Sequence, residues 1–264
     1  MSVRKWIEEL PKKGRITFSM QEIENQFLYM SKEAIRSSIY RMIENGRLYS
    51  VWRGFYVIIP DEHALKGFVP PIEYIESLMA FTGHNYYIGL LSAAAIYGAG
   101  HQQPQVLTII TDSNDIRSIK NKSIFFISKK KISKSFLIEK RAGLSKAMIS
   151  SPELTALDLI CYESRIGGLN RVAEIISELD LDFSGLEYEF WHMHKTPVVQ
   201  RLGYILENIL YRYDCAAEVF SCLKEYKTGF RKTLLDPKNK SNSKDYVVCK
   251  KWKIVVNCDL EIEE

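Results

Sequence analysis

Six polar side chains in the first sixty residues have the chemistry that contact with DNA requires. They are Lys32, Arg36, Ser37, Tyr40, Arg41 and Arg53. The cations can neutralise phosphates, and the hydroxyl and guanidinium donors can reach base edges. Apolar residues recur between the first five at helical spacing, so those five project from the outer face of one helix. The pattern favours a nucleic-acid surface, although a charged outer face is often merely solvated and small helical modules also bind proteins.

Two short helices are predicted before that helix. Ser2 can cap the first, which runs through Leu10 and ends at Pro11 to Gly14. The second begins at Ser19 with the capping-box sequence "SMQE". There the Ser19 hydroxyl is expected to accept the amide hydrogen of Glu22 while the Glu22 carboxylate reaches back.

The third helix carries the polar face. Ser31 begins it after a break at Leu28 to Met30, and Asn45-Gly46 ends it. Its predicted buried stripe is Ala34, Ile35, Ile39, Met42 and Ile43. Because the polar positions lie between these, the core fixes which way they point.

Two β-prone runs, "RLYSVW" and "FYVII", follow directly and predict a hairpin closed at Arg53-Gly54, with Gly54 at a positive φ. The side chains expected to point inward are Leu48, Val51, Phe55 and Val57. A hairpin after such a helix is the wing of a winged helix-turn-helix, and Arg53 at its tip is expected over a minor groove or flanking phosphates.

Charge is unevenly distributed along the chain. Residues 117–146 hold ten Lys and Arg against one acid, Glu139, and residues 1–60 hold ten against six Glu. Within the first of these regions, "SKKKISK" contains Lys129, Lys130, Lys131 and Lys134. These lysines could extend contact with DNA or meet RNA, while a solvated lysine loop is the competing interpretation.

The length of 264 residues favours two domains, and "PDEHALKGFVPP" at residues 60–71 has the composition of a joint between them. We expect a DNA-binding domain at residues 1–62 and a second domain at residues 63–264. No apolar run is long enough to cross a membrane and the first residues lack a secretory pattern, so a cytoplasmic protein is expected. Five cysteines without a Cys-x-x-Cys pair suit reduced thiols, and neither a metal nor a cofactor is implied.

The second domain reads as mixed α and β, which makes the whole chain an α+β protein. Helices are predicted in "IEYIESLMAF", "YYIGLLSAAAIYG", "SPELTALDLICY", "RVAEIISEL" and "VVQRLGYILENILYRY". Strands are predicted in "QVLTIIT", "SIFFIS" and the terminal "KWKIVVN", the last completing the sheet.

Three groups of residues have side chains that could serve enzyme chemistry. A metal-dependent nuclease could use Asp214 with Glu225 and Lys227, but such triplets are common in a chain with 32 acids and 36 bases. His192 and His194 lack a third ligand and fit polar residues on a helix surface. "DLDF" at residues 180–183 follows a helix end rather than the strand that a nucleotidyltransferase needs. We therefore expect no catalytic activity.

Several segments together resemble the AbiEi family of bacterial antitoxins. They are "NGRLYSVWRGFYVI", "YYIGLLSAAAIYGAGHQQPQVLTIIT", "SSPELTALDLICY", "RLGYILE" and "WKIVVN". They are spread over nearly the whole chain, and the second is the most specific.

The resemblance implies an N-terminal winged helix that represses its own operon by binding inverted repeats, with two copies able to pair on DNA. It also implies a C-terminal antitoxin domain that counters a nucleotidyltransferase-type toxin without a stable complex, in abortive phage infection. An adaptor that contacts the toxin directly is the alternative. No single residue of the antitoxin domain is assigned a role by the resemblance.

Overall fold

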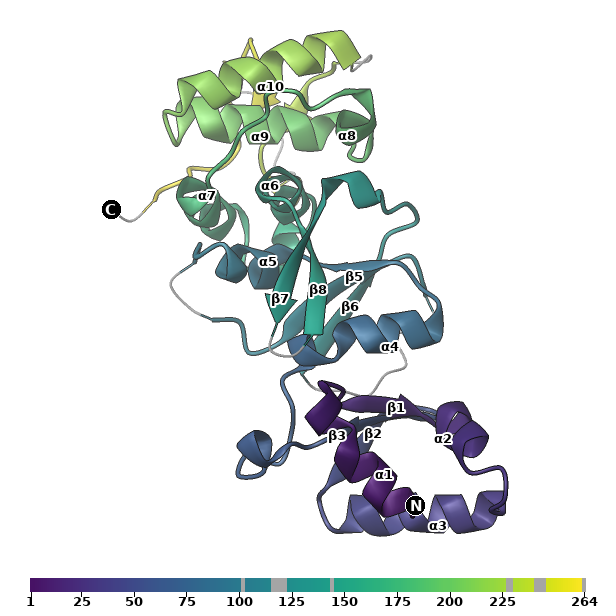
Figure 1. Cartoon of the computed structure of the whole chain (residues 1–264). Helices are drawn as coiled ribbons and strands as arrows, with labels where there is room; N and C mark the ends of the chain where they lie inside the picture. The colour runs from purple at the N-terminus through teal and green to yellow at the C-terminus, as the bar shows by residue number, and fades with distance from the viewer. Residues whose placement is uncertain (101–102, 115–122, 143–144, 227–229, 240–245, 263–264) are drawn as a thin grey trace. The chain divides into compact units, whose positions relative to one another are not determined.

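The computed structural model describes residues 1–100, 103–114, 123–142, 145–226, 230–239 and 246–262 (Figure 1). Residue contacts divide the chain into two compact units. Unit 1 comprises residues 1–88, 105–132 and 138–149, and unit 2 comprises residues 89–104, 133–137 and 150–264. The mixture of helices and strands confirms the predicted α+β class. Among the described residues, no helix has both the length and the apolar character to cross a membrane.

The first part of unit 1 combines three helices with a small sheet (Figure 1). Its elements are α1 (Val3–Glu9), the 3-10 turn η1 (Pro11–Lys13), β1 (Thr17–Ser19), α2 (Met20–Gln26), α3 (Lys32–Glu44), β2 (Leu48–Trp52) and β3 (Phe55–Ile58). The strands are antiparallel in the order β1-β3-β2, with Thr17 opposite Val57 and Leu48 opposite Ile58. The three predicted helices and the hairpin are therefore present.

Aromatic side chains join these elements. Trp6 of α1 meets Phe18 and Phe27 edge-on, with ring centroids 6.0 and 6.2 Å apart, and Phe18 stacks on Tyr56 at 5.2 Å. Phe18 and Phe27 are almost completely buried, and each such burial contributes about 1.5–3 kcal/mol. This core sets the orientation of α3.

Serine hydroxyls cap all three helices as the sequence predicts. The Oγ atoms of Ser2, Ser19 and Ser31 accept the amide hydrogens of Lys5, Glu22 and Ala34. The second half of the predicted capping box differs, because the Glu22 carboxylate binds Arg15 at 2.8 Å instead of reaching back. Charge attraction to a guanidinium replaces a bond to a single amide.

The second part of unit 1 is a five-stranded sheet in the order β6-β5-β4-β8-β7. Its strands are β4 (Tyr86–Ile88), β5 (Leu107–Thr111), β6 (Ile124–Ser128), β7 (Leu137–Ala142) and β8 (Ser145–Ser150). β4 runs antiparallel to β5 and parallel to β8, and β5 runs parallel to β6. The turns η2 (Asp61–His63) and η3 (Pro71–Glu73) and helix α4 (Ile75–Thr82) precede it along the chain.

Three strands of this five-stranded sheet differ from the sequence prediction. Tyr86–Ile88 is a strand, whereas the sequence pattern placed it inside a helix with "GLLSAAAIYG". Its aromatic and β-branched residues fit a strand, and the helix begins only after Gly89. β7 and β8 were not predicted, because their charged residues hide the alternation that marks a strand.

Unit 2 is mainly helical. Its helices are α5 (Leu90–Ile96), α6 (Pro152–Cys161), α7 (Leu169–Glu178), α8 (Tyr188–His192), α9 (Thr196–Asn208) and α10 (Tyr213–Tyr226), with the 3-10 turns η5 (Lys134–Phe136) and η6 (Glu163–Arg165). α6 packs against α5, α7 and α9, and α9 lies beside α10 (Figure 1). The predicted helices here are confirmed, although the one expected over residues 198–213 ends at Asn208, and α8 and α10 were not predicted.

Unit 2 also contains a small three-stranded sheet. Strands β9 (Thr233–Leu234), β10 (Val248–Cys249) and β11 (Ile254–Val255) pair in the order β10-β11-β9. The prediction that "KWKIVVN" completes the main sheet is therefore wrong. Ile254 pairs instead with Thr233, and Gln200 of α9 donates hydrogen bonds to the carbonyls of Arg231 and Trp252, which holds this segment on α9.

Candidate nucleic-acid interface

The predicted polar face lies along the exposed side of α3. The helix buries Ile35, Ile39 and Met42. Lys32, Arg36, Ser37, Tyr40 and Arg41 are all exposed. Lys32, Arg36 and Tyr40 are spaced by four residues and Ser37 and Arg41 also by four, so they form two adjacent rows on one surface.

The cations on this face differ in whether a carboxylate pairs with them. Lys32 forms an ion pair with Glu24 of α2, with Nζ and Oε2 3.3 Å apart. Among the described residues, neither Arg36 nor Arg41 has a carboxylate within ion-pair distance. Burial raises the pKa of Tyr56 in β3 and the positive charge of Arg36 opposes that rise, so Arg36 also lies close to the small sheet. The two arginines are thus better placed than Lys32 to bind an anion.

The hairpin turn at Arg53-Gly54 forms as predicted, with Gly54 at a φ of +78°. The Gly54 carbonyl accepts a hydrogen bond from the Met20 amide at 2.8 Å. Phe55 is buried, and its ring centroid lies 5.3 Å from that of Phe81 in α4. The turn is therefore held by α2 and α4, while the Arg53 side chain is exposed.

The predicted lysine run does not behave as one group. Lys129 is half-buried: its Nζ donates to the Tyr87 hydroxyl at 3.1 Å and its amide to the Thr111 carbonyl at 2.8 Å. Lys130, Lys131 and Lys134 are exposed. Lys129 is thus held at the end of the main sheet, which leaves the other three free to contact a polyanion. Arg117, Lys120 and Lys122 lie outside the described residues.

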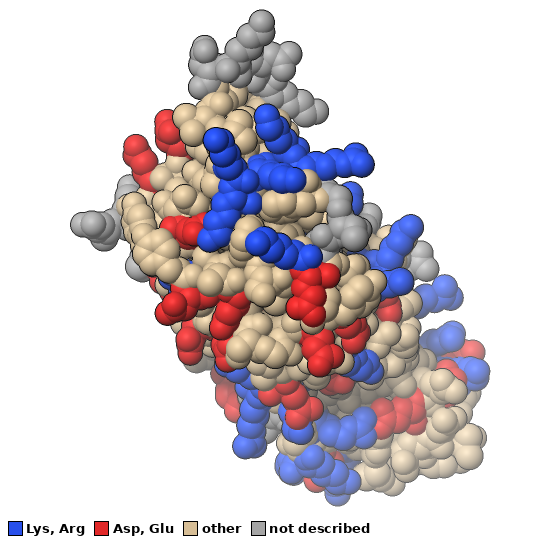
Figure 2. All heavy atoms as spheres, turned by 90° about the horizontal axis from the view of Figure 1, so that it is seen from above, with Lys and Arg blue, Asp and Glu red and all other residues tan. Residues whose placement is uncertain are grey.

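A third basic region was missed in the sequence. Residues 224–253 hold ten Lys and Arg against three acids, which the same charge count along the chain would have found. The exposed members are Lys224, Arg231, Lys232, Lys238, Lys250, Lys251 and Lys253. Figure 2 looks down on the α10 end of unit 2 and shows Lys and Arg side chains gathered on that face.

Aromatic rings support part of this basic face. The Nζ atoms of Lys224 and Lys251 lie 4.6 and 5.0 Å from the centroid of the Phe220 ring. Lys251 is also ion-paired with Glu207 of α9. Cation–π contact holds an ammonium group without neutralising it, so Lys224 keeps its charge available.

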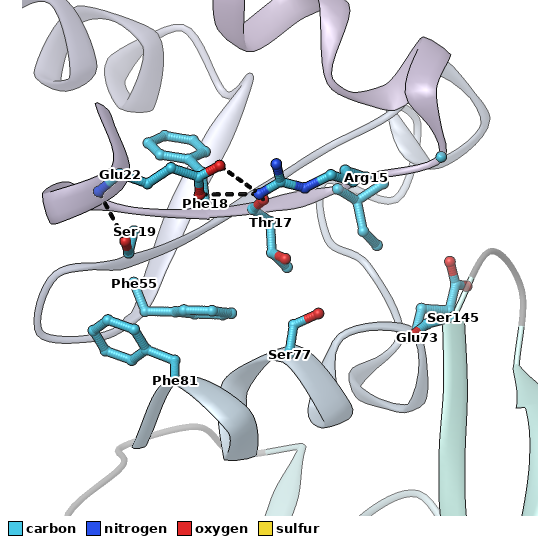
Figure 3. Close-up of a pocket in the computed structure, with 12 residues that line it drawn as sticks. Arg15, Thr17, Phe18, Ser19, Glu22, Phe55, Glu73, Ser77, Phe81 and Ser145 are labelled. Atoms are coloured by element: carbon cyan, nitrogen blue, oxygen red, sulfur yellow. Dashed lines mark hydrogen bonds and ion pairs between the residues drawn. The ribbon is translucent and has the colours of Figure 1, made fainter. Parts of the chain in front are cut away.

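A pocket of about 300 Å³ lies within unit 1 (Figure 3). Arg15, Thr17, Glu22, Glu73, Ser77 and the rings of Phe55 and Phe81 are among its lining residues. Because Arg15 is already paired with Glu22, the pocket does not offer a free cation to an anionic ligand. The Glu73 side chain also lines this pocket.

The residues that could serve enzyme chemistry do not lie together in the structure. Asp214 and Glu225 both lie on α10, eleven positions apart, or about 16 Å along a helix. They cannot share one metal ion, and Lys227 lies outside the described residues. His192 is exposed and stacks on Tyr188.

The prediction that His194 lies on a helix surface is wrong. His194 is buried, and its Nε2 lies 2.8 Å from Oδ1 of the equally buried Asp158 in α6. The Asp158 carboxylate therefore provides a hydrogen-bond partner for Nε2 of an imidazole that water does not reach.

Residues 87–208 match a family model described as the AbiEi antitoxin C-terminal domain. The crystal structure of RV2827C protein from Mycobacterium tuberculosis is similar in fold, with a TM-score of 0.67 over 96% of this chain and 90% of that chain. The two sequences are 15% identical, so this likeness concerns the fold alone. No curated protein matches the chain in sequence.

Proposed function

We propose that this chain, whose residues 87–208 match the AbiEi antitoxin C-terminal domain, is both an antitoxin and a repressor of its own operon. The antitoxin role in a toxin–antitoxin system rests on that domain. The repressor role rests on the first sixty residues and is our inference.

The observation that carries the repressor half is the outer face of α3. Five polar residues share an exposed surface whose reverse side is fixed by Ile35, Ile39 and Met42. An α-helix fits the major groove, and its outward side chains can then reach base edges. Arg36, Ser37 and Tyr40 would supply most of the discrimination between sequences, and Arg41 and Lys32 would grip phosphates.

The hairpin supports the same proposal. The element order of residues 1–58, with a hairpin directly after α3, suits a winged helix-turn-helix, and we propose residues 1–62 as the DNA-binding domain. Arg53 would contact the backbone or a minor groove. The packing of Phe55 on Phe81 supports this role, because a turn held in place loses less conformational freedom on binding.

The toxin that we propose is of nucleotidyltransferase type, countered without a stable complex, as the AbiEi resemblance implies. Lys130, Lys131 and Lys134 are proposed as further contacts to nucleic acid. The rival account is an adaptor that binds the toxin directly. Co-purification of the neighbouring gene product with this protein at a fixed stoichiometry would favour the adaptor.

Separating the two activities in cells tests the proposal. One strain carries a reporter under the upstream DNA, and another carries the neighbouring toxin gene under an inducible promoter. We expect the wild-type chain to silence the reporter and to restore growth, and R36A/R41A to lose only the first activity. R4A is the matched control, because Arg4 is an exposed arginine on α1 that pairs with Glu8. Equal repression by R36A/R41A and R4A would contradict the role of α3, and failure of the wild type to restore growth would contradict the choice of toxin.

A further inference from the structure

Three potential metal ligands meet in the segment between β3 and α4. Nε2 of His63 lies 3.2 and 3.4 Å from the two carboxylate oxygens of Glu73 and 3.9 Å from Oε1 of Glu62. One ligand atom from each of the three residues lies within 4.8 Å of the others. They come from two separate turns, with Glu62 and His63 in η2 and Glu73 in η3.

A hydrogen bond alone accounts poorly for this arrangement. A neutral imidazole has one N–H and can satisfy one carboxylate oxygen with it, whereas two carboxylates face the same nitrogen. The His63 and Glu73 side chains are only 13% and 14% exposed, so water screens the carboxylate charge of Glu73 weakly. A divalent cation would neutralise both carboxylates and use the Nε2 lone pair.

We propose that Glu62, His63 and Glu73 bind a divalent transition-metal ion of the zinc class. Nitrogen and oxygen ligands lie about 2.0–2.2 Å from Zn²⁺, which places neighbouring ligand atoms about 3.4 Å apart in a tetrahedron. The separations of 3.2 and 3.4 Å from Nε2 to Glu73 are close to that value, and the exposed Glu62 side chain, at 3.9 Å, would have to move closer. One imidazole with two carboxylates suits Zn²⁺ better than Mg²⁺ or Ca²⁺, which prefer oxygen alone. Water completes the coordination.

The surrounding chain holds the two turns in place. The Tyr49 hydroxyl accepts the Val69 amide hydrogen at 3.2 Å and donates to the Val69 carbonyl at 3.3 Å. The Glu73 amide donates to the Pro70 carbonyl at 3.0 Å, which sets the start of η3. A partly formed site of this kind costs less ordering when the ion binds.

Solvent reaches the ligands from two sides. Glu62 is 65% exposed, and Glu73 also lines the pocket in Figure 3. A bound ion would join η2 to η3 and so close the segment from residue 62 to residue 73 into a loop. Because the ion binds only the folded arrangement, it would raise the stability of unit 1.

Zinc titration of the full-length, tag-free, metal-free protein against a chromophoric chelator tests the site. We expect the wild type to bind one equivalent of Zn²⁺. H63A and E73Q should bind it about tenfold or more weakly, because loss of even a group that only hydrogen-bonds to a metal ligand reduces affinity by that much. E62Q changes an exposed side chain and should also weaken binding while leaving the fold intact. Co²⁺ should give the visible absorption of a low-coordinate site in the wild type but not in H63A.

H84A is the matched control, because His84 lies beside a single carboxylate, with Nδ1 3.6 Å from Asp112 Oδ1. It should bind Zn²⁺ as the wild type does. Absence of binding to the wild type would overturn the proposal. Equal affinity in the wild type, H63A, E73Q and E62Q would also overturn it, because the zinc would then be held elsewhere, for instance by the cysteine thiols.

Discussion

The indole ring of Trp252 fills the space beside Gly203 in which any other residue would place its side chain. A Cβ atom at Gly203 would lie 2.0 Å from Cζ3 of Trp252, closer than real side chains approach. Trp252 is fully buried, and its Nε1 donates a hydrogen bond to the Glu207 carboxylate. The absence of a side chain at Gly203, together with the hydrogen bonds of Gln200, therefore allows the segment around Trp252 to pack on α9.

G203A should reduce the free energy of unfolding by about 1–3 kcal/mol, because the indole must move out of a packed position. Alanine itself favours a helix by about 1 kcal/mol over glycine, so a loss can come only from packing. Denaturant unfolding followed by tryptophan fluorescence measures the change. S221A, at an exposed position of α10, should leave stability within about 0.5 kcal/mol. A G203A variant more stable than the wild type, by about the 1 kcal/mol that alanine adds to a helix, would show that Trp252 does not dock there.

The buried pair of Asp158 and His194 yields a second prediction. H194A should cost about 3–5 kcal/mol, because a buried carboxylate loses the imidazole that stabilises its charge. The side chains are 0% and 2% exposed, so water cannot take over that role. Thermal and urea unfolding at pH 7.5, with the solvent conditions held equal, provide the measurement.

H192A serves as its control two residues away. The His192 imidazole is exposed and stacks on Tyr188 with ring centroids 3.7 Å apart, and its removal should cost less than about 1 kcal/mol. If the two variants lose similar amounts of stability, the Asp158–His194 contact is not the structural element that we describe.

Cys258 provides a test of pH dependence. Burial, with the nearby charges of Asp236 and Asp259 adding to it, raises the pKa of this thiol to about 11. Since only the thiolate reacts, alkylation of Cys258 by iodoacetamide in the native protein should keep rising about tenfold per pH unit beyond the ordinary cysteine pKa of about 8.5. In the urea-unfolded chain the rate should level off near that ordinary value.

The raised pKa of Cys258 also makes the free energy of unfolding depend on pH in one direction. The folded state holds the Cys258 proton more tightly than the unfolded state does, so this contribution to the free energy of unfolding is present below the unfolded pKa and is lost as pH rises through about 11. C258A should therefore lose less stability than the wild type between about pH 9 and 11. A native alkylation rate that levels off as early as the unfolded one would contradict the shifted pKa.

The first sixty residues were the most predictable part of the chain, because local signals there agree with one another. Ser2, Ser19 and Ser31 cap helices, Gly54 turns the hairpin, and the apolar residues of α3 are spaced to face a core. These effects act over a few residues and so can be recognised without the fold. The resemblance to the AbiEi family is likewise confirmed, by the domain at residues 87–208.

Long-range pairing explains most of what was missed. Nothing near "KWKIVVN" indicates that Ile254 pairs with Thr233, and the burial of His194 depends on Asp158, thirty-six residues earlier. Glu62, His63 and Glu73 lie in two separate turns, and the proline-containing segment that holds them has the composition of a linker between domains. The boundary at residue 62 and the DNA-facing roles on α3 and at Arg53 stay predictions.

Replacing Arg36 and replacing Arg53 by alanine should change DNA binding in different ways. R36A should cost about 1–3 kcal/mol of binding and relax the preference for one base pair, if Arg36 grips a base edge. R53A should weaken binding to every duplex alike, because a phosphate contact has no sequence information. Competition binding against a set of single-base operator variants distinguishes these outcomes. Identical base preferences in R36A and wild type would remove Arg36 from base recognition.

The most direct test of the central proposal is a titration of the purified protein against its own upstream DNA and a scrambled duplex of equal length, each at several salt concentrations. We predict tight binding to the upstream duplex, much weaker binding to the scrambled one, and a steep loss of affinity with salt for both. R36A/R41A should lose the preference for the upstream duplex over the scrambled one, and R4A should keep it. Equal, weak binding of the wild type to both duplexes would contradict the assignment of α3 as the DNA-reading helix and leave the adaptor account in its place.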